Sequence, residues 1–226
     1  MQLIYAAASP FARKVRVLAA ETGLLDRIEL LDTAVLPTTL NEGVNALNPL
    51  GKIPALERDD GPAIYDSRVI CRYLDHVSGA GLYPAGSDLW PVLTLEATAD
   101  GMLEAALLMV YETRLRPEAL RFAPWVEGQW AKVARALDAI EARGMVLLEG
   151  RLTMAHVAVA VALSYLDFRH AERHCHRHND SHKTKYAALT FRLHSLLQQG
   201  HCRGRESRNN QTDEEEQAIE QDQVCG

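Results

Sequence analysis

The secondary-structure pattern of the chain changes near residue 79. Before that point, short apolar runs typical of strands alternate with segments whose apolar residues recur at helical spacing. The predicted strands cover residues 2–6, 28–31, 54–57 and 63–65. With the intervening helices, the predicted order is β-α-β-α-β-β-α. After Pro84 the strand patterns stop, so we predict an α+β chain in which a mixed domain precedes an all-α domain.

The predicted second domain is a bundle of helical segments. Residues 89–115 and 125–143 carry apolar residues at helical spacing, whereas Thr153–Asp167 is apolar on nearly every face and is expected in the core. Glycine and proline residues between the two halves are typical of a linker. We therefore predict a first domain at residues 1–78, a linker at 79–88, a helical domain at 89–170 and an atypical polar tail at 171–226.

The amino-acid composition of the chain narrows the classes of function that it could have. The 226 residues are 47% hydrophobic and have a net charge of −6, which argues against a general nucleic-acid binder. No apolar run approaches the roughly 20 residues that span a bilayer, and the first residues do not resemble a signal peptide. The four cysteines are scattered without a disulfide or metal pattern, which favours a reducing cytoplasm.

A serine lies where the first predicted strand passes into a helix. The run at residues 9–16 reads Ser-Pro-Phe-Ala-Arg-Lys-Val-Arg, with a hydroxyl that can cap the helix and a proline at its first position. A helix N-terminus offers free N–H groups and positive potential, and a thiol with a pKa of about 8.5 needs both to ionise at neutral pH. Ser9 is therefore either a plain N-cap or a hydroxyl that holds a thiolate.

The loop before the third predicted strand is a second candidate site. Residues 48–56 read Asn-Pro-Leu-Gly-Lys-Ile-Pro-Ala-Leu, and Pro54 at the strand start is a candidate cis proline. A cis bond would turn the backbone of Ile53 towards a groove, where it could pair with an extended peptide. The alternative is an ordinary loop proline. Lys52 is either a cationic ligand of that peptide or a solvated lysine.

The pair Asp66-Ser67 begins the next predicted helix. The Ser67 hydroxyl and the first N–H groups of the helix suit a carboxylate, and Asp66 suits an ammonium group. Together they could hold an amino-acid head group. A simple capping pair is the alternative.

In order and spacing, these features resemble the glutathione transferase family. The runs at 9–16 and 48–56, with Asp-Ser-Arg-Val-Ile-Cys-Arg-Tyr-Leu-Asp at 66–75, resemble its glutathione-binding half. Leu-Tyr-Pro at 82–84 resembles its interdomain linker. Segments 99–101, 130–137 and 165–169 resemble the helical half of bacterial members. The resemblance covers residues 1 to about 170.

The resemblance implies a thioredoxin-like first domain that holds glutathione. Ser9 would donate a hydrogen bond to the glutathione thiolate, and Tyr5 is a rival hydroxyl within the first strand. Implied glutathione-binding residues are Phe11, Lys52, Ile53, Pro54, Asp66 and Ser67. Of these, the Ile53 backbone would bind the cysteinyl residue, the pair at 66–67 the γ-glutamyl group, and Lys52 a carboxylate.

The implied reaction is attack of the glutathione thiolate on a small apolar electrophile. Glutathione is the co-substrate, with no bound cofactor and no metal. The implied setting is a cytoplasmic homodimer with a role in detoxification and without nucleic-acid or membrane partners. The electrophile would lie between the domains against Met102, Leu103, Leu107 and Tyr111, although residues at helical spacing are also typical of a core.

Three other functions are alternatives to this one. The first is a non-catalytic glutathione-binding or scaffold protein, because a fold does not determine an activity. A thiol–disulfide oxidoreductase is disfavoured because residues 9–12 hold no cysteine where a CxxC motif would lie. A Ser9-centred hydrolase is disfavoured because no G-x-S-x-G elbow is visible.

The chain departs from the family pattern at two places. His156 stands where the family usually has an aspartate in a capping box, so we expect a weaker helix start at Thr153. The His-rich and then acidic tail is either a metal-binding appendage, with His174, Cys175, His176 and His178 as ligand types, or the product of a frame shift near residue 172, which the abrupt change of composition favours. An alternative reading frame without an apolar helical sequence would rule out the frame shift.

Overall fold

A computed structural model of the protein describes residues 1–175. Its first domain is built on a four-stranded mixed sheet in the order β2-β1-β3-β4. The strands are β1 (Gln2–Tyr5), β2 (Glu29–Asp32), β3 (Ala55–Arg58) and β4 (Gly61–Ile64). β1 runs parallel to β2 and antiparallel to β3, which pairs antiparallel with β4. Leu3 lies opposite both Leu30 and Leu56 and is completely buried. All four predicted strands are present, with ends shifted by one or two residues.

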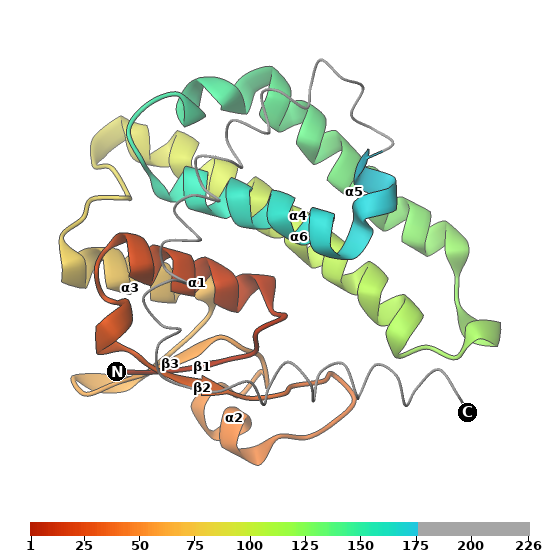
Figure 1. Cartoon of the computed structure of the whole chain (residues 1–226), viewed down its shortest axis with the longest axis horizontal. Helices are drawn as coiled ribbons and strands as arrows, with labels where there is room; N and C mark the ends of the chain where they lie inside the picture. The colour runs from red at the N-terminus through yellow and green to blue at the C-terminus, as the bar shows by residue number, and fades with distance from the viewer. Residues whose placement is uncertain (176–226) are drawn as a thin grey trace, which may run out of the picture.

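Three helices complete this domain and confirm the predicted β-α-β-α-β-β-α order. They are α1 (Pro10–Glu21), α2 (Glu42–Leu47) and α3 (Ser67–Ser78), with a short 3-10 turn at Leu25–Arg27. Each α-helix begins after a residue whose side chain accepts a hydrogen bond from the first turn, namely Ser9, Asn41 and Asp66. In Figure 1, α1 and α3 lie between the sheet and the remaining helices, whereas α2 lies on the opposite face of the sheet.

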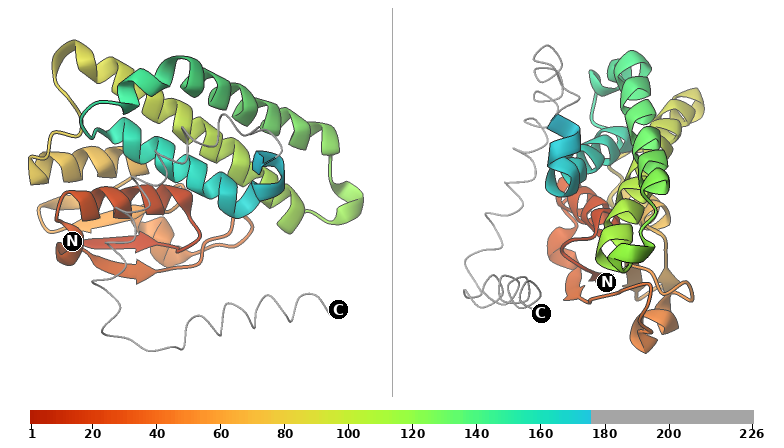
Figure 2. Two further views of the ribbon diagram at one scale, coloured as in Figure 1. Left: turned by 45° about the horizontal axis from the view of Figure 1, so that its top comes forward. Right: turned by 90° about the vertical axis from the view of Figure 1, so that its right-hand side faces the viewer.

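The second domain is helical, as predicted. Its long helices are α4 (Leu89–Arg114), α5 (Ala123–Ala139) and α6 (Met154–Cys175). Single turns lie at Gly86–Asp88, Glu118–Leu120 and Met145–Leu148, and α5 passes into a π-helical turn at Ile140–Gly144. α6 packs against both α4 and α1, and every residue from Met154 to Leu163 is buried, so the apolar segment predicted to be central is central. Figure 2 shows the same three helices from two further sides.

The start of α6 corrects one expectation. The histidine does close a capping box, because Nδ1 of His156 accepts a hydrogen bond from the backbone N–H of Thr153 at 3.1 Å. An unprotonated imidazole nitrogen is an acceptor like a carboxylate oxygen. The substitution of histidine for aspartate therefore preserves the cap that we expected it to weaken.

The structure describes only the first residues of the predicted tail. Residues 171–175 continue α6, after a non-helical backbone conformation at His170 (φ −138°, ψ 32°). The frame-shift hypothesis and the metal-binding alternative concern residues that lie, almost entirely, outside the described part of the chain. Among the described helices, none has the length and apolar character needed to cross a membrane.

Candidate functional site

The strand register brings the three candidate segments to one end of the sheet. Ile4, near the end of β1, pairs with Ala55 at the start of β3, and Leu56 pairs with Ile64 at the end of β4. The residues that follow β1, precede β3 and follow β4 therefore emerge together. These are the segments that contain Ser9, Ile53 and Asp66.

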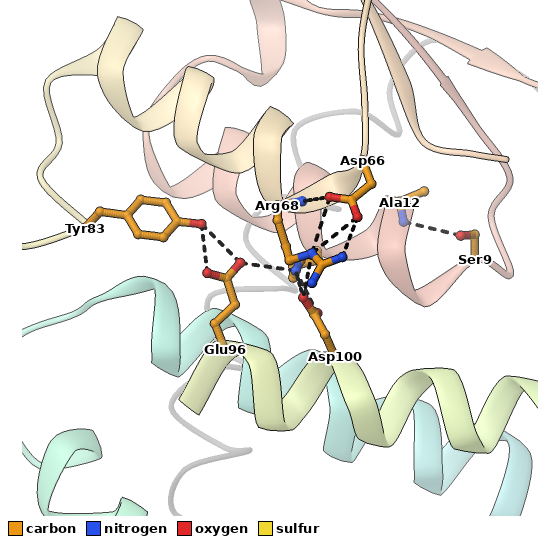
Figure 3. Close-up of polar contacts among 8 residues, drawn as sticks. Ser9, Ala12, Asp66, Arg68, Tyr83, Glu96 and Asp100 are labelled. Atoms are coloured by element: carbon orange, nitrogen blue, oxygen red, sulfur yellow. Dashed lines mark hydrogen bonds and ion pairs between the residues drawn. The ribbon is translucent and has the colours of Figure 1, made fainter. Parts of the chain in front are cut away.

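Ser9 caps α1, and its hydroxyl proton is donated to no residue that the structure describes. Its Oγ accepts a hydrogen bond from the backbone N–H of Ala12 at 3.3 Å, and Pro10 occupies the first helical position (Figure 3). A serine oxygen has two acceptor lone pairs and one O–H donor, so capping leaves the donor available. The two interpretations of Ser9 are therefore compatible, since one side chain can cap the helix and donate to an anion.

The loop before β3 has the backbone geometry that its sequence predicted. The Ile53–Pro54 peptide bond is cis, and no backbone hydrogen bond of Ile53 is formed within residues 1–175. Buried Asn48 holds the loop: its Nδ2 donates to the carbonyl of Lys52 at 2.8 Å, and its Oδ1 accepts from the N–H of Leu50 at 3.0 Å. Asn48 was part of the motif, but its role in shaping the loop was not predicted.

Asp66 and Ser67 form the N-terminus of α3. Oδ1 of Asp66 accepts from the backbone N–H of Arg68 at 3.0 Å, and its Oδ2 lies 2.7 Å from Nη2 of the same arginine. Partial burial opposes ionisation of Asp66, but these hydrogen bonds and the Arg68 charge outweigh it and lower the pKa of the carboxyl. Ser67 is buried, and its hydroxyl makes no hydrogen bond to any residue that the structure describes. Asp66 is therefore an anion at neutral pH, beside a serine hydroxyl that has no hydrogen-bond partner among the described residues.

A cluster of buried charged side chains lies between α1 and α4. Nζ of Lys14, on α1, lies 2.7 Å from both carboxylate oxygens of Asp100 and 3.2 Å from Oε1 of Glu96, on α4. All three side chains are buried. Burial alone would lower the pKa of Lys14, but the acidic groups around it, Cys71 first and then Asp100 and Glu96, raise it. Lys14 is therefore a charged ammonium inside the interface between the two domains.

The cluster extends to the interdomain linker on one side and to Asp66 on the other. The hydroxyl of Tyr83 donates to Glu96 at 3.1 Å, and Nε of Arg68 lies 4.0 Å from Oδ2 of Asp100 (Figure 3). Sequence reasoning missed this cluster. A usable signal existed: Glu96 and Asp100 are four residues apart on the face of α4 that also carries Ala99 and Leu103, both buried.

The remaining predicted glutathione-site residues lie around the same region. Phe11 is half-buried in the first turn of α1 and packs against the core, and Lys52 is exposed and makes no ion pair within the described part of the chain. Tyr5 lies in β1 as predicted, with the guanidinium of Arg16 stacked 4.9 Å from its ring centroid. Tyr5 is therefore the last residue of β1, whereas Ser9 precedes α1.

The four predicted pocket residues fall into two pairs. Met102 and Leu103 are completely buried in the main hydrophobic core, so they do not line an open pocket. Their helical spacing reflects core packing, the alternative that the pattern left open. Leu107 and Tyr111 are half-buried on the same helix and keep accessible surface. Among the described residues, no group of three or more His, Cys, Asp or Glu side chains is arranged to hold a metal ion.

Comparison with known families gives two matches. The family model for the glutathione S-transferase N-terminal domain matches residues 8–77, and that for the C-terminal domain matches residues 123–190. The second match extends beyond residue 172, near which the frame shift is hypothesised, and the hypothesis stays a prediction.

Individual relatives agree with the family matches. The GST-like protein YibF of Escherichia coli is 34% identical over 176 residues, covering 75% of this chain and 83% of that protein. A glutathione transferase family member from Pseudomonas fluorescens, solved with bound glutathione, is 42% identical with a TM-score of 0.79, covering 85% of this chain and 93% of the other. A second structure from that species, with S-(propanoic acid)-glutathione, is 40% identical with a TM-score of 0.75 at the same coverage. With its thioredoxin-like domain, its helical domain and these matches, the chain belongs to the glutathione transferase family.

Proposed function

We propose that this protein is a glutathione transferase that joins the thiolate of glutathione to a small apolar electrophile. A bond forms between the sulfur and an electrophilic carbon, the thiol proton passes to solvent, and the displaced electron pair leaves with the leaving group or stays on the adduct. The enzyme contributes ionisation of the thiol and positioning of the two reactants. Neither a metal nor a covalent enzyme intermediate is required.

The observation that carries the proposal is the Ser9 hydroxyl at the N-terminus of α1. Its oxygen is engaged by the N–H of Ala12, which leaves its proton to donate to a sulfur anion. The positive end of the helix adds to the stabilisation of negative charge at that point. Each unit by which the site lowers the thiol pKa corresponds to about 1.4 kcal/mol of preference for the anion.

The rest of the tripeptide has complementary groups within reach of the same end of the sheet. The backbone of Ile53, which forms no hydrogen bond within residues 1–175, suits the cysteinyl residue, because extended peptides bind to free backbone groups as an added strand does. Ionised Asp66 suits the γ-glutamyl ammonium, and the Ser67 hydroxyl suits its carboxylate. Lys52, exposed and unpaired among the described residues, suits the glycine carboxylate. The bound glutathione in the Pseudomonas fluorescens relative supports glutathione as the ligand.

The electrophile is proposed to bind against α4. Leu107 and Tyr111 remain the candidates there, because both keep accessible surface whereas Met102 and Leu103 do not. The relative solved with S-(propanoic acid)-glutathione supports an S-substituted glutathione as the kind of product that such a site holds.

The cellular setting is part of the same proposal. We place the protein in the cytoplasm as a homodimer with a role in detoxification, since glutathione keeps thiols reduced in that compartment. Light scattering at micromolar concentration tests the dimer, and a monomer at those concentrations would remove it from the proposal.

The test of this proposal measures both the binding of glutathione and its conjugation to electrophiles. The full chain is applied to immobilised glutathione and eluted with free glutathione, and conjugation is then assayed with a chlorodinitrobenzene and a panel of small alkyl halides and epoxides. We expect retention and conjugation. Ser9→Ala should lower kcat/KM by about 10- to 100-fold, since hydrogen bonds to charged groups contribute about 1.5–3 kcal/mol. The pH–rate profile of the variant should shift to higher pH because the bound thiol loses its donor.

Two results would contradict the proposal in different ways. Retention without conjugation of any electrophile identifies a glutathione-binding protein without transferase activity. If Ser9→Ala keeps full activity and Tyr5→Phe loses it, the hydroxyl that donates to the thiolate is that of Tyr5. Ser9→Ala also removes the N-cap, which costs about 1 kcal/mol of stability, so both variants are compared well below their melting temperatures.

A further inference from the structure

The two accessible pocket residues of α4 lie on the face of the helix that meets the first domain. Asp100 identifies that face, because its carboxylate lies 2.7 Å from Nζ of Lys14 on α1. Leu107 is seven residues beyond Asp100, which is close to two full turns, so the two side chains share a face. Tyr111 follows Leu107 by four residues and continues the same stripe. An electrophile bound at Leu107 and Tyr111 would therefore lie between the two domains.

The stripe extends in the direction of the proposed thiolate site. In Figure 3, α4 runs past Glu96 and Asp100 and continues towards the side of the view on which Ser9 caps α1. The part of α4 beyond Asp100 is the part that carries Leu107 and Tyr111. The sulfur proposed at Ser9 and the accessible part of α4 therefore lie on the same side of the cluster of buried charged side chains.

An arginine ends this stripe. Arg114 is the last residue of α4, three residues beyond Tyr111 and seven beyond Leu107, so all three side chains share one face of the helix. Arg114 is exposed, and its guanidinium makes no hydrogen bond or ion pair to any residue that the structure describes. The stripe is therefore apolar at Leu107, aromatic at Tyr111 and cationic at its end.

The neighbouring arginines of the loop after α4 have partners within the protein. Nε of Arg116 lies 2.8 Å from Oε2 of Glu112, so its charge is neutralised locally. Nη2 of Arg121 donates to the backbone carbonyl of Thr113 at 2.7 Å and fastens the loop to the last turn of α4. These two arginines have structural contacts that explain them. Arg114 has none among the described residues, and its donors are available to a ligand.

Helix α6 brings a second arginine to the same region. The two helices pack together, and Nε2 of His170 on α6 lies 3.0 Å from the carbonyl oxygen of Ala106 on α4. Burial raises the pKa of the Tyr165 hydroxyl to about 12, and the charges that oppose this rise are those of Arg169 and Arg114. The two guanidinium groups, one from each helix, therefore act on the same buried tyrosine.

This region has cationic and neutral donors without an acidic partner. Neither Arg114 nor Arg169 forms an ion pair in the part of the chain that the structure describes. The hydroxyl of half-buried Tyr111 is not hydrogen-bonded to any described residue, and burial raises its pKa, so at neutral pH it is a protonated donor. A carboxylate accepts hydrogen bonds from a guanidinium and from a hydroxyl at the same time. The missing partner is therefore an anion.

We propose that Arg114 and the hydroxyl of Tyr111 bind an anionic group on the electrophile, so that the favoured substrates are apolar electrophiles that end in a carboxylate. Leu107 and the Tyr111 ring contact the apolar body, and Arg169 adds positive potential. Arg114 is a specificity-determining residue, because the group that it binds is not the carbon that the thiolate attacks. The inference rests on the proposed function and narrows its electrophile from small apolar compounds in general to those that carry one anionic group.

The experiment compares two conjugates that differ only in charge. Isothermal titration calorimetry measures the binding of S-(4-carboxybenzyl)glutathione, of its neutral amide S-(4-carbamoylbenzyl)glutathione and of glutathione itself. The proteins are the wild type, Arg114→Met, Arg114→Glu, Tyr111→Phe and Arg72→Met. Arg72 is the matched control, because it is an exposed arginine on α3 that stacks on the ring of Tyr83. Conjugation is assayed in parallel with 4-(bromomethyl)benzoate and 4-(bromomethyl)benzamide, in which the thiolate sulfur bonds to the benzylic carbon and bromide leaves.

The proposal predicts a preference for the charged conjugate. The wild type should bind the carboxylate about five- to tenfold more tightly than the amide, a modest factor because Arg114 is exposed. The preference should shrink in about 0.5 M salt, which screens exposed charges. Arg114→Met should abolish it without changing the affinity for the amide or for glutathione, Arg114→Glu should reverse it, and Tyr111→Phe should reduce it. Arg72→Met should leave it unchanged, and kcat/KM for the two bromides should follow the same order.

The outcomes separate this inference from the proposed function. If the wild type binds none of the three ligands, the proposed function fails and the inference falls with it. If the conjugates bind with the expected preference but neither bromide is conjugated, the transferase activity fails and the anion site stands. If the wild type binds both conjugates equally, or Arg114→Met keeps the preference or weakens both conjugates alike, the inference is wrong. Thermal denaturation of each variant checks that the differences arise in a folded protein.

Discussion

At the scale of single residues, Asn48 determines the shape of the loop that carries Ile53. Both ends of its side-chain amide are bonded to the loop backbone, at the carbonyl of Lys52 and the N–H of Leu50. The side chain is buried, so neither bond is replaced by water if it is lost. A single amide thereby orients the backbone that is proposed to bind the cysteinyl residue.

Asn48→Asp tests this role. The aspartate keeps the acceptor for Leu50 but loses the donor, and it places a carboxylate oxygen against the carbonyl of Lys52. We expect a loss of about 1–3 kcal/mol of stability and, measured by calorimetry, a glutathione affinity reduced about tenfold. Asn41→Asp is the matched control, since Asn41 caps α2 through its Oδ1 and aspartate caps equally well, while the bond that its Nδ2 donates to the carbonyl of Ala34 is exposed and long, at 3.4 Å. Equal loss of affinity in both variants would remove Asn48 from this role.

At the scale of elements, the linker is tied to both domains by specific hydrogen bonds. The carboxylate of buried Asp75, on α3, accepts from the N–H of Leu82 at 2.7 Å and from that of Tyr83 at 3.1 Å. The carbonyl of Leu82 in turn accepts from the N–H of Met154 at the start of α6 at 2.9 Å. The linker that the sequence marked by its glycines and proline joins α3 to α4 along the chain, and its backbone is hydrogen-bonded to both α3 and α6.

We predict that Asp75→Asn destabilises this connection. An amide has one acceptor oxygen and would turn an NH2 donor towards a backbone N–H, so about 1–3 kcal/mol of unfolding free energy should be lost. Chemical denaturation measures the loss. Asp88→Asn is the control, because the Asp88 side chain is exposed and makes no capping hydrogen bond at α4. A destabilisation of the same size in Asp88→Asn would contradict the assignment.

At the scale of the whole molecule, the two domains are joined through a buried ion cluster. Lys14 comes from the first domain, and Glu96 and Asp100 come from α4 in the second. Removing one partner of a buried pair leaves a buried charge uncompensated, which costs about 3–5 kcal/mol. The interface therefore depends on a single lysine that is completely buried.

Lys14→Met should destabilise the protein by about that amount, 3–5 kcal/mol, in urea denaturation near neutral pH. The double variant Lys14→Met, Asp100→Leu should recover much of the loss, because it removes a charge from each side of the pair. Lys132→Met, which removes an exposed lysine from α5, is the control and should change stability little. If the lysine stabilises the protein by packing alone, the double variant should not recover the stability that Lys14→Met loses.

The pH dependence of stability has a predictable sign. The pKa of Lys14 is raised above its ordinary value of 10.5 in the folded protein, so the stability it contributes is complete below that value and is lost as pH rises through the folded pKa. The unfolding free energy of the wild type should therefore fall more steeply above about pH 10.5 than that of Lys14→Met. Parallel curves for the two proteins would contradict a charged lysine in the cluster.

Much of the fold and part of the site could be predicted because they depend on local chemistry. Apolar spacing marked the strands and helices, Ser9 and Asp66 marked helix starts, and Pro54 marked a cis bond, all through interactions within a few residues. The failures involve contacts between distant segments. Met102 and Leu103 were candidates for a pocket but are buried in the core, and Lys14 was not singled out because its partners Glu96 and Asp100 are distant in the sequence.

By itself, the sequence determined the order of the secondary-structure elements, the caps that begin α1 and α3, and the three segments that form the candidate site. These features depend on backbone preferences and on hydrogen bonds between near neighbours, which the order of residues specifies directly. Only the tertiary structure decided which charges are buried and paired, which pocket residues stay accessible, and that Arg68 stands between Asp66 and Asp100. Burial and long-range pairing depend on how α1, α3 and α4 pack together, and that packing is a property of the whole fold.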